Sequence, residues 1–76
     1  MKLSTLGRGQ AARITSVHHV PAVIRHRLAV MGLIPGTAVE LVRRAPLGDP
    51  LQIRLDNEQL IVRREIAKLI DVEAMS

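Results

Sequence analysis

Three histidines are the residues of this sequence best suited to chemistry at neutral pH. His18 and His19 are adjacent, His26 follows further along the chain, and Ser16 lies just before the pair. Neutral imidazoles bind zinc and ferrous ions, and an imidazole beside a hydroxyl can activate a nucleophile. The sequence therefore raises two hypotheses, a metal site and a nucleophilic site.

The nucleophilic hypothesis has little support beyond Ser16 and His18. These two side chains would point to the same side of a strand, but no carboxylate lies nearby in sequence to orient the imidazole. The sequence has no nucleophile elbow, no phosphate loop and no His-Glu-x-x-His motif. The paired acids Asp56 and Glu58 flank a predicted hairpin turn, where solubility explains them. We therefore predict that the protein is not an enzyme.

The metal hypothesis depends on His18, His19 and His26. Adjacent side chains of an extended segment point to opposite faces, so His18 and His19 are not expected to share one ion. One of them together with His26 would supply two ligands, and a carboxylate or a second subunit would have to add more. Exposed histidines beside a loop are the other interpretation. We expect no required cofactor and keep Fe(II) or Zn(II) binding at these histidines as an alternative.

The composition of the chain excludes several kinds of site. Its 76 residues allow a single domain, and they include no Cys, Trp, Tyr or Phe. Without Cys there are no disulfides or cysteine zinc sites. Without aromatics there is no base-stacking platform, no groove for proline-rich peptides and no methyl-lysine cage. Because 47% of the residues are hydrophobic, we expect an ordered core made of aliphatic side chains.

The charge is uneven along the chain. Eleven Lys and Arg stand against 7 Asp and Glu, a formal charge of +4, and residues 1–39 contain no acid. A basic surface favours an acidic partner or phosphate, but the cations form no run and nothing could stack on bases. We expect no nucleic-acid binding and keep a nucleic-acid-binding barrel as a second alternative. Since no apolar run approaches a membrane span of about 20 residues or a signal peptide, we expect a soluble, cytoplasmic protein.

The elements that must position these residues are short and mostly extended. Apolar and polar residues alternate in five segments, as in half-buried strands. The strands are expected at residues 11–17, 38–44, 51–55, 58–62 and around 70–72, and a single helical turn is expected over 63–67. The side chains predicted to face the core are Ala12, Ile14, Val39, Leu41, Leu51, Ile53 and Leu55.

One helix is predicted between the first two strands. Pro21 suits its first turn, and Ile24, Leu28 and Met31 recur at helical spacing as one apolar stripe. Gly32 should end this helix as a glycine in the left-handed conformation.

These elements predict one mostly β domain over residues 1–76. The step Pro35-Gly36 is a turn with Gly36 at positive φ, and like Gly32 these two residues are given a structural role. Five short strands with one helix after the first favour a small antiparallel β-barrel. Closing or nearly closing the sheet would hide its edge strands.

Residues 43–50 join two strands through a long, stiff loop. Pro46 and Pro50 restrict its backbone, and the apolar Leu47 lies between them. A rigid loop that presents Leu47 to a partner loses little conformational entropy on binding. The other interpretation is that Leu47 folds back onto the end of the barrel, and the residues alone leave both open.

The order of these segments resembles a known family. Its members share a Met-Gly-Leu-x-Pro-Gly step, a proline-bounded loop and a later basic turn, found here as Met31-Gly32-Leu33, Pro35-Gly36, Arg44-Ala45-Pro46-Leu47-Gly48-Asp49-Pro50, and Arg63 with Ala67 and Ile70. From Leu3 to Val72 the chain resembles the ferrous iron transport protein A (FeoA) family.

This resemblance implies a fold and a role. The fold would be an SH3-like antiparallel β-barrel with a helix inserted after the first strand. The role would be that of a small cytosolic accessory or regulatory protein of bacterial ferrous iron uptake. Its partner would be ferrous iron transport protein B, a membrane transporter with a GTP-hydrolysing domain, which would hold the chain at the inner face of the membrane. A related domain ends the iron-dependent repressors, so direct metal sensing is the first alternative.

The expected partner-binding residues follow from the loop and its charges. Leu47 would be the apolar anchor, because a barrel without aromatics must bind through aliphatic and charged surface. Arg25 and Arg44 would add charge complementarity. The remaining residues assigned to this surface are Pro46, Gly48, Asp49 and Pro50. An exposed Leu47 would also allow weak self-association.

Overall fold

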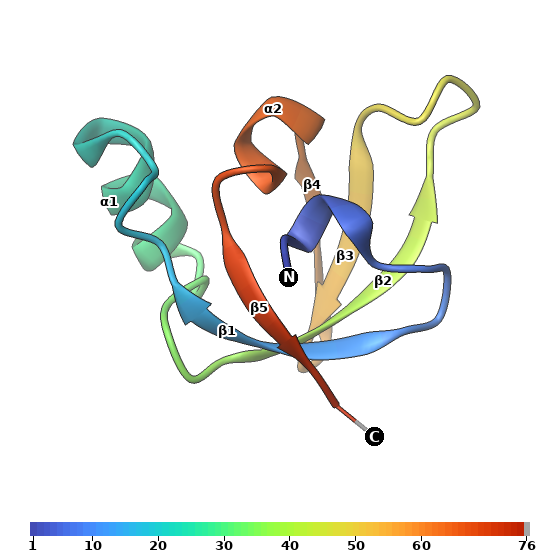
Figure 1. The fold of residues 1–76 in the computed structure, drawn as a ribbon, viewed down its shortest axis with the longest axis horizontal. Helices are drawn as coiled ribbons and strands as arrows, with labels where there is room; N and C mark the ends of the chain where they lie inside the picture. The colour runs from blue at the N-terminus through green and yellow to red at the C-terminus, as the bar shows by residue number, and fades with distance from the viewer. Residues whose placement is uncertain (76) are drawn as a thin grey trace.

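The computed structural model describes residues 1–75 and contains one five-stranded antiparallel sheet (Figure 1). The strand order is β4-β3-β2-β1-β5. The strands are β1 (Ala11–Ser16), β2 (Ala38–Arg44), β3 (Leu51–Leu55), β4 (Glu58–Val62) and β5 (Asp71–Ala74). Two α-helices, α1 (Ala22–Val30) and α2 (Arg64–Ala67), and a 3-10 helix, η1 (Leu3–Thr5), complete the fold. The predicted mostly β architecture with one inserted helix is confirmed.

The core is aliphatic and lies inside the curved sheet. Each side chain that alternation predicted to face inward is buried, from Ala12 and Ile14 on β1 to Leu51 and Ile53 on β3. The sheet bends where pairing shifts between Ile14 and Ser16 on β1, and again on β2. Such bulges raise local twist and let a short sheet wrap around its own core.

The helix α1 ends as a Schellman motif. Gly32 has a φ of +92° and donates its N–H to the carbonyl of Ala29, while Leu33 donates to Leu28. Leu28 and Leu33, which lie on either side of this turn, are both buried. The prediction for Met31 is wrong, because its side chain is 41% exposed. Met31 is the C-cap, where the chain leaves the helix, and Leu33 fills the core instead.

The turn after this helix is as predicted. Thr37 donates its N–H to the carbonyl of Ile34, which encloses Pro35 and Gly36 in a β-turn. Gly36 has a φ of +96°, a conformation that glycine adopts without strain. Its N–H bonds the carbonyl of Ile14, so the turn is fastened to β1.

The N-terminal residues cover β5, which the sequence patterns did not predict. Val72 donates its N–H to the carbonyl of Met1, and Leu3 donates to Ile70. Leu3 and the following Leu6 are buried in the core. Within residues 1–75 no strand pair joins β4 to β5, so one edge of β5 has no partner strand. The N-terminal segment covers that edge. Among the same residues, no helix has the length and apolar character to cross a bilayer.

Candidate functional site

The loop between β2 and β3 is a closed, well-bonded turn. Ala45 donates its N–H to the carbonyl of Pro50, and Gly48 donates to the carbonyl of Ala45, at 3.0 and 2.7 Å. Pro46 occupies the second turn position, which its fixed φ suits. Gly48 has a φ of +85°. These contacts hold the loop, residues 45–50, in one shape.

Leu47 stands at the tip of this 45–50 loop and is 92% exposed. The loop extends beyond the ends of β2 and β3 in Figure 1. Of the two interpretations left open by the sequence, folding back onto the barrel is therefore wrong. The rigid turn thus holds a large aliphatic side chain in water.

Asp49 attaches the 45–50 loop to α2. Its Oδ1 accepts the backbone N–H of Arg64 at 2.9 Å. The guanidinium of Arg64 also lies beside the loop, since its Nη1 is 3.7 Å from where a Cβ on Gly48 would stand. Arg64 is thus a cation that lies beside the 45–50 loop. Sequence reasoning placed it only in a helical turn, because nothing local shows that α2 packs against this loop.

A shallow hollow lies at the base of the same loop, on the outer side of the sheet. Its walls come from strands β2, β3 and β4 and from both ends of the loop: Arg43, Ala45, Pro50, Gln52 and Ile61. Ile61 is 64% exposed on β4, an edge strand of the sheet. Pro50 and Ile61 thus add apolar surface at the base of the loop.

The structure does not bring the other two predicted cations to the loop tip. Arg44 is half-buried, and its Nη2 donates to the carbonyls of Ser4 and Leu6. Both hydrogens of that nitrogen are used to hold the N-terminal segment. Arg25 lies on α1, which Figure 1 places at the opposite end of the molecule from the 45–50 loop. Arg25 and Leu47 therefore do not belong to one continuous patch.

His18 and His19 lie together, contrary to the prediction that they would point apart. Their ring centroids are 4.0 Å apart. The expectation was wrong because the segment turns after β1, where Val20 donates its N–H to the carbonyl of Val17. Asp71 joins them, and one ligand atom from each of the three lies within 4.8 Å of the others. His26 is exposed on α1 and is not part of this group.

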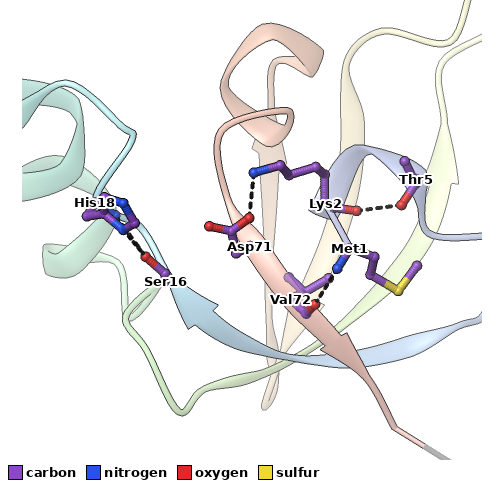
Figure 2. Close-up of polar contacts among 7 residues, drawn as sticks. All are labelled: Met1, Lys2, Thr5, Ser16, His18, Asp71 and Val72. Carbon is purple, nitrogen blue, oxygen red and sulfur yellow. Dashed lines mark hydrogen bonds and ion pairs between the residues drawn. The ribbon is translucent and has the colours of Figure 1, made fainter.

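Ser16 contacts His18 directly, with Oγ 2.5 Å from Nδ1 (Figure 2). Oγ also accepts the backbone N–H of His18 at 3.2 Å. The sheet supplies the carboxylate that the local sequence lacked, because Ser16 pairs with Asp71 in the β1–β5 ladder. A serine, a histidine and an aspartate thus come together, with the imidazole held by a local turn of the chain.

Asp71 is bound on its other side by Lys2. The Lys2 ammonium lies 2.5 Å from Oδ1 of Asp71, and in Figure 2 the second carboxylate oxygen points towards the side of His18. This hydrogen bond lowers the pKa of Asp71 below its ordinary value, while burial acts in the opposite direction. The nearby His19 and His18 lower that pKa as well. Asp71 is therefore a carboxylate at neutral pH.

Comparison with known proteins identifies relatives over the whole chain. A model of the FeoA domain matches residues 1–74. The sequence is 38% identical over 76 residues to an Fe(2+) transport protein A/Fe(2+) transporter FeoB fusion protein of Porphyromonas gingivalis. That match covers all of this chain but 9% of the relative, so the chain spans only a small part of that protein's length.

Solved structures share the fold. The FeoA protein of Chlorobium tepidum is 38% identical, with a TM-score of 0.95 over all of this chain and 71% of its own. A zinc complex of Stenotrophomonas maltophilia FeoA, described as a prokaryotic SH3 domain protein, is 30% identical, with a TM-score of 0.82. The alignment covers 96% of this chain and 89% of that one. The predicted SH3-like fold is thus confirmed.

Proposed function

Because this chain belongs to the FeoA family, which is related to ferrous iron transport, we propose that it is an accessory protein of ferrous iron uptake that binds the transporter FeoB. Binding would take place on the cytoplasmic side of the membrane, where the transporter carries its GTP-hydrolysing domain. The protein performs no catalytic step in this proposal.

The observation that supports this proposal most strongly is the fusion protein of Porphyromonas gingivalis. In that relative, one polypeptide contains both Fe(2+) transport protein A and the FeoB transporter. Covalent linkage raises the effective concentration of two modules and makes a weak contact sufficient. Such a contact still needs a surface that supplies specific affinity.

The 45–50 loop is the surface best suited to that task. Leu47 is 92% exposed and is held by the Ala45–Gly48 and Ala45–Pro50 bonds, so its burial would cost little ordering entropy. Arg64 lies beside Gly48, the residue after Leu47, and would add charge complementarity in the place first given to Arg25. An apolar centre with a polar rim is the usual composition of a non-obligate interface.

In this proposal the protein acts by shifting a conformational equilibrium of the transporter. A ligand can change such an equilibrium only as far as its affinity differs between the two states. Contacts through the 45–50 loop that exist in one transporter state would therefore favour that state. This requires no bound nucleotide or reactive group on the accessory chain.

Binding to the purified full-length transporter in detergent tests the proposal. Calorimetry would be run without nucleotide, with GDP and with a GTP analogue, using wild type and Leu47→Asp. Val30→Asp is the matched control, because Val30 is 75% exposed but lies on α1, at the other end of the molecule. We expect at least tenfold weaker binding for Leu47→Asp, about 1.4 kcal/mol, and wild-type affinity for the control. No binding in any condition, or equal affinity of both variants, would contradict the proposal.

A further inference from the structure

We propose that His18, His19 and Asp71 bind one divalent transition-metal ion, with Asp71 in the place that sequence reasoning gave to His26. Ligand atoms of these three residues lie within 4.8 Å of one another. They come from the turn after β1 and from the first residue of β5, so the site exists only in the folded protein. It lies apart from the 45–50 loop and does not depend on the transporter.

The sheet itself positions the carboxylate. Ser16 and Asp71 are partners in the β1–β5 ladder, and the pairing shifts between Ile14 and Ser16. A shift of this kind redirects the side chains that follow it. The two histidines follow directly, in a turn that brings both rings to one side.

Small movements would complete the coordination. Donors that each lie about 2.0–2.2 Å from one tetrahedral ion are about 3.3–3.6 Å apart. Ligand atoms that lie within 4.8 Å of one another would therefore have to approach by as much as about 1.5 Å. His18 and His19 are both exposed, so rotation of their side chains is free of core packing.

Two neighbouring groups hold the ligands in a suitable orientation. Ser16 Oγ lies 2.5 Å from Nδ1 of His18 and forms a hydrogen bond with it. The other ring nitrogen, Nε2, is therefore the one that would bind a metal. Lys2 holds one oxygen of Asp71 at 2.5 Å, and the other points towards His18 in Figure 2. Metal-binding histidines and carboxylates are commonly fixed by such outer hydrogen bonds.

The chemistry of the donors selects the kind of ion. Two imidazoles and one carboxylate suit zinc and ferrous ions and leave positions open for water. Magnesium and calcium prefer oxygen ligands alone. Because the Lys2 ammonium offsets the charge of Asp71, attraction for hard cations is weak and the imidazoles provide most of the affinity.

The imidazole protons provide a direct test. The sequence has no Phe, Tyr or Trp, so His18, His19 and His26 are the only aromatic side chains seen by proton NMR. Zinc added to the intact chain near neutral pH should shift the signals of His18 and His19 and leave those of His26 in place. Magnesium at the same concentration should shift none.

Variants decide whether Asp71 is a ligand. Asp71→Asn should weaken zinc binding at least about tenfold, because loss of even an outer partner costs 10–100-fold. His26→Ala is the control and should bind as wild type does. Equal shifts of all three histidines, or unchanged affinity of Asp71→Asn, would overturn the proposal. If the amide spectrum shows that Asp71→Asn is unfolded, His19→Ala takes its place with the same expected loss, and unchanged binding there is equally decisive.

Discussion

The carboxylate of Asp49 caps the helix α2 from a different part of the chain, by accepting the backbone N–H of Arg64 at 2.9 Å. The N-cap residue of α2, Arg63, makes no side-chain capping bond of its own. The first N–H groups of a helix have no partner within it, so Asp49 satisfies one of them. The same contact fixes the 45–50 loop relative to the helix.

Replacing Asp49 by Ala should therefore destabilise the protein. Loss of a capping carboxylate costs about 0.5–2 kcal/mol, which a lower urea midpoint in far-ultraviolet circular dichroism would show. Asp49→Asn keeps an oxygen that can accept the Arg64 N–H and should retain most of the stability. If Asp49→Ala unfolds at the wild-type urea concentration, the loop is not held by this contact.

Arg44→Met should lower stability more than Arg43→Met. Arg44 bonds the carbonyls of Ser4 and Leu6, whereas its neighbour Arg43 is exposed on the same strand. Hydrogen bonds to charged groups contribute about 1.5–3 kcal/mol, so the Arg44 variant should lose an amount of this order. Amide exchange near Leu6 should also become faster in Arg44→Met only. Equal free energies of unfolding for the two variants would show that these bonds add nothing.

Gly32→Ala should destabilise the protein more than Gly36→Ala. Both glycines have positive φ, +92° and +96°, so alanine is strained at each by about 1–2 kcal/mol. Only at Gly32 would the new Cβ also meet a neighbour, Cδ1 of the buried Leu55 at 3.0 Å. Thermal melts of the two variants separate backbone strain from this contact. Identical melting temperatures would mean that Leu55 moves aside without cost.

The Lys2–Asp71 pair should contribute to stability at neutral pH and lose that contribution in acid. The Lys2 hydrogen bond lowers the pKa of Asp71 in the folded protein. A carboxyl group whose pKa is lower in the folded than in the unfolded protein stabilises the fold at pH values above its ordinary pKa, about 3.9. That stabilisation is lost as the pH falls through the pKa of the folded state. Wild type should therefore exceed Lys2→Met in urea midpoint at pH 7, and the difference should shrink below about pH 4. A difference that is constant with pH would contradict this.

Local patterns predicted most of the fold. Alternation over β1 to β3 identified the buried side chains because each strand has one face in the core. The end of α1 at Gly32 and the turn at Gly36 were predictable because both need a positive φ. Met31 was assigned wrongly to the core, since a helical spacing cannot show at which residue the chain leaves the helix.

Contacts between distant segments were not predictable. Asp71 reaches His18 through the register of β1 with β5, and Arg64 reaches the loop through Asp49. Neither relationship has a local signature in the sequence. The covering of β5 by Met1 and Leu3 was missed for the same reason. The exposed position of Leu47 was thus one of two interpretations open from the sequence, whereas the position of Arg64 beside the 45–50 loop was not predictable.

The position of β1 has a consequence for the order of folding. Residues 11–16 lie between β2 and β5 in the sheet, and residues 71–74 supply the second partner strand. β1 can pair with β2 early, but its other edge stays open until β5 docks. Non-local pairing of this kind slows folding and leaves an exposed edge on the partly folded chain. Aggregation during refolding should therefore compete most strongly before β5 pairs with β1.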